Sequence, residues 1–71
     1  MAIVTDENEV VFSKVCPSEQ KAEVAIVEYL RKNKEYDGED FGYAFFWIGD
    51  NDLKLNLMVF DMPPEEFENV K

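Results

Sequence analysis

The 71-residue sequence is short enough for only one domain, and its 16 acidic and 7 basic residues give a net charge of −9. Phosphate groups repel such a chain, so direct binding to nucleic acid or to an anionic membrane is not expected. Hydrophobic residues make up 46% of the chain and aromatic residues 14%, which is enough for a folded core despite the charge. We therefore expect a single acidic α+β domain over residues 1–71.

Two β-rich runs at the start of the chain predict a hairpin. Residues 2–5 and 10–16 are rich in β-branched side chains, and an acidic segment at residues 6–9 separates them. Asn8 favours a turn in this segment because asparagine tolerates the left-handed backbone conformation.

An amphipathic helix is predicted next, over residues 17–34. Pro17 suits the first helical position, where its missing N–H costs nothing. Apolar side chains then recur at helical spacing from Ala22 to Leu30. Basic residues up to Lys34 occupy the end where the helix dipole favours positive charge.

A second hairpin is predicted over residues 43–60. Residues 43–48 have high β propensity, and residues 53–60 alternate between two faces around a turn at residues 49–52. In this register Phe46 faces Leu55 on an apolar surface that the helix covers.

The expected fold is therefore α+β, a two-layer sandwich with the order ββαββ. It has four mostly antiparallel strands, one amphipathic helix on one face and a short C-terminal helical tail after Pro63 and Pro64.

The predicted register places an aromatic cluster on the sheet face that the helix does not cover. Its members are Tyr43, Phe45, Trp47, Met58 and Phe60. Soluble monomers rarely leave such a patch bare, and aromatic residues and methionine are enriched at protein interfaces. The sequence leaves two alternatives for what covers this face. One is a partner or a second copy, and the other is the C-terminal tail through Met62, Phe67 and Val70.

The same topology predicts an acidic pole at one end of the domain, built from the first turn, the loop after the helix and the tail. Its members are Asp6, Glu7, Glu9, Glu35, Asp37, Glu39, Asp40, Glu65 and Glu66. Carboxylates held on a scaffold can imitate a nucleic-acid backbone and occupy the basic groove of a nucleic-acid-binding protein. The alternative is that these charges serve only solubility.

The residue inventory argues against catalysis. The chain has no histidine, which is the commonest general base and metal ligand. Residues 49–52 resemble the start of a calcium loop, but Lys54 and Leu55 stand where that loop needs a ligand and a glycine. We expect no enzyme activity, no cofactor and no metal site.

The location predicted for the protein is the cytoplasm, or the host cytoplasm if the protein is viral. Cys16 is the only cysteine, so no internal disulfide can form. Residues 1–9 lack the basic start of a signal peptide, and no apolar run approaches the roughly 20 residues of a membrane span.

The predicted function is protein–protein interaction. We expect a small acidic module that inhibits or regulates a protein with a basic surface, such as one that handles nucleic acid. The acidic pole, the aromatic face or both would make the contact. Some phage inhibitors of host defence are small acidic proteins of this style, an analogy of class that would suit a phage or mobile-element origin. The alternative is a homo-oligomeric structural or accessory protein with the aromatic face as its dimer interface.

Overall fold

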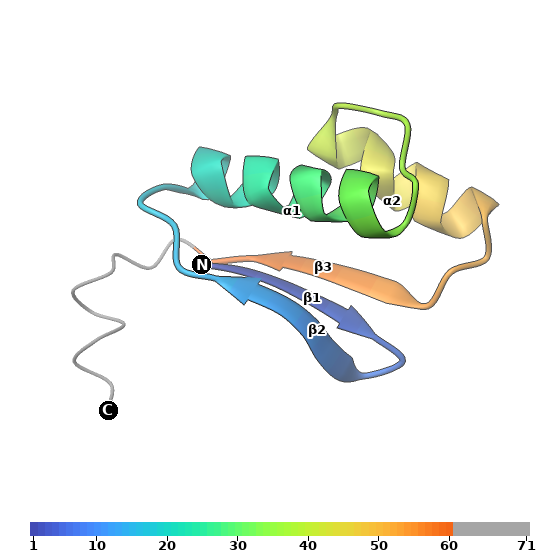
Figure 1. Ribbon diagram of the computed structural model, residues 1–71, viewed down its shortest axis with the longest axis horizontal. Helices are drawn as coiled ribbons and strands as arrows, with labels where there is room; N and C mark the ends of the chain where they lie inside the picture. Colours follow the sequence, from blue (N-terminus) through green and yellow to red (C-terminus); the bar gives the residue numbers. More distant parts are fainter. Residues whose placement is uncertain (61–71) are drawn as a thin grey trace.

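Two helices lie on one face of a three-stranded antiparallel sheet in the computed structural model, which describes residues 1–60 (Figure 1). The elements are β1 (Ala2–Asp6), β2 (Glu9–Lys14), α1 (Glu19–Asn33), α2 (Phe41–Asp50) and β3 (Leu55–Val59). The α+β class is confirmed. The predicted ββαββ order with four strands is not confirmed, and the predicted C-terminal helical tail lies outside the described residues.

The first hairpin forms as predicted. β1 pairs with β2 in antiparallel register, with Asp6 opposite Glu9. Glu7 (φ 51°) and Asn8 (φ 71°) both adopt the left-handed conformation, as a two-residue type I′ turn requires. A register shift after Val4 produces a β-bulge in this hairpin, which increases the local twist.

Helix α1 begins two residues later than predicted, at Glu19. Ser18 caps it, and the Ser18 side chain accepts a hydrogen bond of 3.2 Å from the backbone N–H of Lys21. Its buried residues, which include Ile26 and Leu30, belong to the predicted apolar stripe and cover the sheet.

The predicted strand at residues 43–48 is wrong, because this segment lies within helix α2. The Asp40 carboxylate accepts a hydrogen bond of 2.8 Å from the Tyr43 N–H and so caps the helix. Ala44 and Ile48, one turn apart, are both buried in the core. Capping together with burial of this helical face outweighs the β propensity of the aromatic residues, a preference that depends strongly on context.

Strand β3 pairs with β1 rather than with residues 43–48. The register places Leu57 opposite Val4, and the sheet order is β2-β1-β3. Leu55 lies opposite Asp6, beside the β1–β2 turn, while the Phe60 N–H donates to the Met1 carbonyl over 2.8 Å at the other end. The last strand therefore runs away from the first turn, whereas the predicted topology had it return there.

The core lies between the helices and one face of the sheet. Val4, Ile26 and Leu30 are its largest fully buried side chains, and Leu55 and Leu57 are buried beside them. The prediction that Leu55 and Leu57 face the helix layer is confirmed. The prediction that Phe46 joins them is wrong, because Phe46 lies on α2 with its side chain exposed.

Candidate functional site

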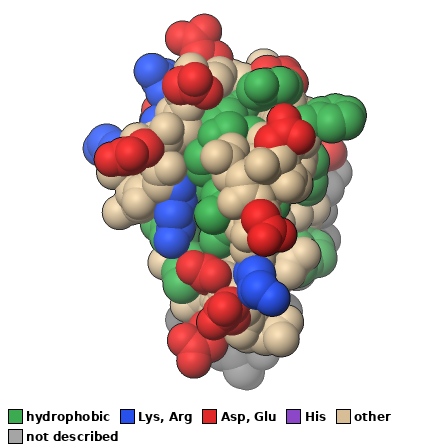
Figure 2. All heavy atoms as spheres, turned by 90° about the vertical axis from the view of Figure 1, so that its right-hand side faces the viewer, with side chains coloured by type: hydrophobic (Ala, Val, Ile, Leu, Met, Phe, Trp, Pro, Cys, Tyr) green, Lys and Arg blue, Asp and Glu red, His purple; other side chains and the backbone are tan. Residues whose placement is uncertain are grey.

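The outer face of α2 carries the most exposed aromatic side chain of the described residues. We define this outer face as Gly42, Phe45, Phe46 and Gly49, which follow the i, i+3, i+4, i+7 spacing of one helix side. Phe46 is 72% exposed and Phe45 49% exposed, whereas Ile48 on the opposite side is only 8% exposed. Figure 2 views the end of the molecule where α2 terminates and shows hydrophobic side chains at the surface among acidic ones.

The five residues of the predicted aromatic face do not form one surface. Tyr43, Phe45 and Trp47 lie on α2, on the helix side of the sheet. Met58 pairs with Ile3 and, by strand alternation, points to the face that the helices leave uncovered. The predicted aromatic sheet face is therefore wrong, although Phe45 and Tyr43 are about half exposed on the helix.

The remaining member, Phe60, is also exposed, but it lies just beyond the end of β3, beside Met1. The outer face of α2 includes Phe46, which the sequence interpretation assigned to the core. The helical spacing of Phe41, Ala44 and Ile48 after a capping aspartate is the signal that would have identified the helix, and with it the outward position of Phe46.

Tyr36 positions α2 from beneath. Its ring is 3% exposed and packs against Trp47, with ring centroids 4.9 Å apart, and more distantly against Tyr43 at 6.4 Å. Its hydroxyl donates a hydrogen bond of 2.7 Å to the backbone carbonyl of Asp40, the residue that caps α2. Tyr36 therefore links the end of α1 to the start of α2.

The buried position of Tyr36 also changes its acidity. Burial raises the pKa of the Tyr36 hydroxyl above its usual value, and the nearby Asp40, Tyr43 and Asp37 raise it further. Gly38 passes close to this ring, since a Cβ at Gly38 would lie 2.6 Å from the Tyr36 Cζ. The loop is therefore shaped around a neutral tyrosine.

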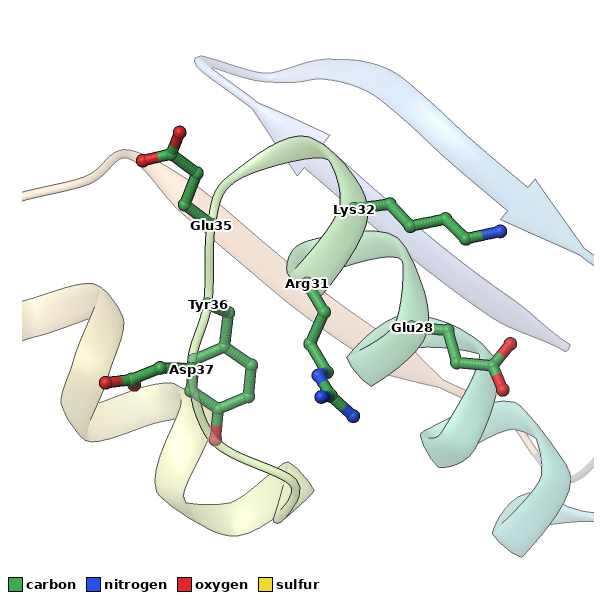
Figure 3. Close-up of a pocket in the computed structure, with 6 residues that line it drawn as sticks. All are labelled: Glu28, Arg31, Lys32, Glu35, Tyr36 and Asp37. Carbon is green, nitrogen blue, oxygen red and sulfur yellow. The ribbon is translucent and has the colours of Figure 1, made fainter.

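An open hollow of about 630 Å³ lies along the end of α1 and the following loop (Figure 3). Its lining residues are Glu28, Arg31, Lys32, Glu35, Tyr36 and Asp37. In Figure 3, Lys32 and Glu28 point away from Glu35 and Asp37, so the charged groups diverge instead of converging on one point. A small-molecule site needs convergent polar groups in an enclosed apolar cavity, and this hollow offers neither.

The acidic residues of the predicted pole divide between two regions. The β1–β2 turn lies beside the end of α1, because Lys34 Nζ is 3.3 Å from Asp6 Oδ2. Glu35 follows Lys34 and belongs to this end. In contrast, Glu39 and Asp40 line a hollow with Gln20 and Glu23 from the first turns of α1.

The other residues of the predicted acidic pole are also not gathered in one place. Glu7 lies in the β1–β2 turn and Glu9 follows it, and the Glu7 N–H donates to the Lys54 carbonyl over 3.1 Å. Asp37 lies on the loop before α2, whereas Glu65 and Glu66 lie outside the described residues. The acidic residues of residues 1–60 therefore do not form a single pole.

The segment that contains α2 has a one-sided charge. Residues 35–53 contain six acidic residues and no lysine or arginine. The six are Glu35, Asp37, Glu39, Asp40, Asp50 and Asp52, and all are exposed. Asp40 caps the start of α2 and Asp50 ends it, one turn beyond Phe46. The exposed phenylalanines therefore lie between acidic residues.

The described part of the chain has no candidate metal site and no candidate membrane span. Within residues 1–60, no three His, Cys, Asp or Glu side chains are grouped so that they could hold a metal ion. Neither of the helices described there has the length and hydrophobicity to cross a membrane. Comparison with known proteins finds no matching family model, no curated protein of similar sequence and no similar solved structure.

Proposed function

We propose that this protein acts by binding another protein through the outer face of α2, and that it inhibits or regulates that partner. The observation that carries the proposal is the 72% exposure of Phe46 next to the half-exposed Phe45 on a helix whose opposite side is buried. A fully apolar helix surface is otherwise expected inside a protein, and aromatic residues are prominent among interface hot spots.

The size of the apolar surface supports a specific contact. A buried aromatic side chain contributes 150–250 Å², so the exposed parts of Phe45, Phe46 and Tyr43 amount to roughly 300–400 Å². This area matches the largest apolar patches of soluble monomers, which often serve a function. A stable interface buries about 800 Å² per partner, so polar residues around the phenylalanines must complete it.

The charge of the surrounding residues indicates the chemistry of the partner. Six exposed acids and no basic residue give residues 35–53, the segment that carries α2, a negative charge, and Asp50 lies one turn after Phe46. The complementary surface is apolar at its centre and carries lysine or arginine around it. Proteins that handle nucleic acid have such basic surfaces, so the proposed partners include this class of protein.

A homodimer through the same surface is less favourable. A two-fold axis at the outer face of α2 would place the same residues of both copies together, including Asp50. Because no lysine or arginine in residues 35–53 can compensate, these carboxylates would repel one another. The proposal therefore favours a different protein over a second copy.

Photo-crosslinking in the native host tests the proposal. A photoreactive phenylalanine analogue at Phe46 is compared with the same analogue at Val10, which is 63% exposed on β2. We expect a discrete adduct with one other protein from position 46 and none from position 10. Purified with that protein, a Phe46→Ala variant should bind about 30-fold more weakly, which corresponds to about 2 kcal/mol.

Three results would contradict the proposal. The first is the same adduct pattern from both positions. The second is a crosslinked homodimer, which would support the dimer alternative. The third is an intramolecular crosslink to residues 61–71, which would show that the tail covers this surface.

A further inference from the structure

We propose that the partner presents a cationic amphipathic α-helix to the outer face of α2, and that this helix approaches most closely at Gly49. The inference rests on the proposed function and specifies the kind of element that the surface receives.

The fold explains two of the three glycines but not Gly49. Gly38 is required because a side chain there would collide with Tyr36. A Cβ at Gly42 would lie 3.1 Å from Asp40 Oδ2, on the carboxylate that caps α2. At Gly49 no atom of residues 1–60 would lie within 4 Å of an added Cβ, and the residue does not have a positive φ.

Gly49 is therefore a weak helix former at a helical position where any L-residue would fit. Its position suggests a reason that lies outside the chain. It is three residues after Phe46 and four after Phe45, so all three share one side of α2. The surface consequently has a projecting phenyl ring beside a bare stretch of backbone.

A helix is the element that fits this shape. The separation of two packed helices, 8–10 Å, depends on the side chains at their contact, and a glycine allows the closer approach. The Phe46 ring can then insert between the side-chain ridges of the second helix. A strand of the partner would need free backbone hydrogen-bonding groups on α2 to pair with. A helix of the partner needs none, because it uses its own N–H and C=O groups internally.

The negative charge of the same segment indicates that the partner helix is positively charged. Acidic residues stand at both ends of α2, at Asp40 and Asp50, and residues 35–53 contain no lysine or arginine. A helix with an apolar stripe flanked by lysine or arginine matches this arrangement. A second copy of α2 does not, because it would bring further aspartates.

The test uses the full chain and a synthetic amphipathic peptide helix made of leucine and lysine. One control peptide has the same composition in an alternating, strand-forming order, and another replaces lysine with glutamate. The peptides are titrated into isotope-labelled protein, and the affinity and the amide shifts are measured. We expect saturable binding of the first peptide alone, with the largest shifts at Phe45, Phe46 and Gly49.

Substitution at Gly49 separates this inference from its alternatives. Gly49→Leu should weaken binding of the leucine–lysine helix at least about tenfold while thermal stability stays the same or rises, because leucine favours a helix. The matched control Asn33→Leu adds the same side chain at the exposed end of α1, with no change of charge, and should leave binding unchanged.

The outcomes also distinguish this inference from the proposed function. Binding lost in Phe46→Ala but kept in Gly49→Leu would overturn the close helix approach and leave α2 as the contact surface. Binding unaffected by either substitution would overturn both. Equal binding of the strand-forming peptide, or no binding of the leucine–lysine helix, would overturn the helical partner.

Discussion

Truncation of two nearby apolar residues of α2 should destabilise the fold to very different extents. Ile48 is 8% exposed and belongs to the core, whereas Phe46, two residues earlier, is 72% exposed. In a helix these residues point in different directions, but in a strand they would point to the same face. The pair Phe46→Ala and Ile48→Ala therefore tests the structure of this segment.

The expected magnitudes follow from burial. Truncation of a buried isoleucine to alanine costs about 2–5 kcal/mol, and Ile48→Ala should fall within this range. A fully buried Phe→Ala change costs about 3–5 kcal/mol, but only about a quarter of Phe46 is buried. We therefore expect Phe46→Ala to lower the free energy of unfolding by about 1 kcal/mol or less.

Urea denaturation followed by Trp47 fluorescence measures both values, because Trp47 is partly buried against Tyr36. The midpoint of Ile48→Ala should move much further than that of Phe46→Ala, with similar slopes. If Phe46→Ala cost as much as Ile48→Ala or more, Phe46 would be a core residue and the helical assignment of α2 would be refuted.

Three further predictions concern the junction between α1 and α2. The raised pKa of Tyr36 means that the folded protein holds this proton more tightly than the unfolded chain. Its contribution to stability is full below the unfolded pKa of about 10 and is lost as the pH rises through the folded value. As the pH rises above about 9, the urea midpoint should therefore fall less in Tyr36→Phe than in the wild type. An equal fall of the midpoint in the two proteins would contradict this. Gly38→Ala should lower the free energy of unfolding by about 1–3 kcal/mol, because its Cβ meets the Tyr36 ring, and an unchanged urea midpoint would show that the loop yields freely. Glu35→Gly should raise the free energy of unfolding by about 1 kcal/mol, and with it the melting temperature, because Glu35 has a φ of 59°; a lower melting temperature would indicate that the Glu35 side chain stabilises the loop.

The elements that the sequence predicts correctly are those whose signals are local. Asn8 and its acidic neighbours determine the first turn, and the stripe from Ala22 to Leu30 determines α1. These signals require no knowledge of distant residues. The pairing of β3 with β1 joins residues 49 to 57 positions apart, and no short pattern in the chain encodes it.

The sequence wrongly predicts a strand at residues 43–48 because every one of these residues is apolar. A run without polar positions fits a period of 2 and a period of 3.6 equally well, so β propensity decided the assignment. Asp40, which caps the helix, lies outside the run, in a segment whose glycines and acidic residues predict a loop. The predicted strand therefore placed Phe46 in the core, and it placed Tyr43 and Trp47 on the sheet face away from the helix.

The acidic pole depended on the same error. With residues 43–48 as a strand, the last strand would return to the first turn and bring the tail acids with it. In the structure β3 starts at that turn, beside Asp6, and ends next to Met1. The charge asymmetry that survives is local to residues 35–53, the segment that contains α2.

The backbone chemical shifts of residues 41–50 in solution test the central claim most directly, because the contact surface exists only if this segment is helical. The account predicts helical Cα and Cβ shifts from Phe41 to Asp50, which place Phe45, Phe46 and Gly49 on one side of α2. Extended shifts over residues 43–48 would contradict it, since adjacent residues of a strand point to opposite faces and Phe45 and Phe46 could not form a common surface.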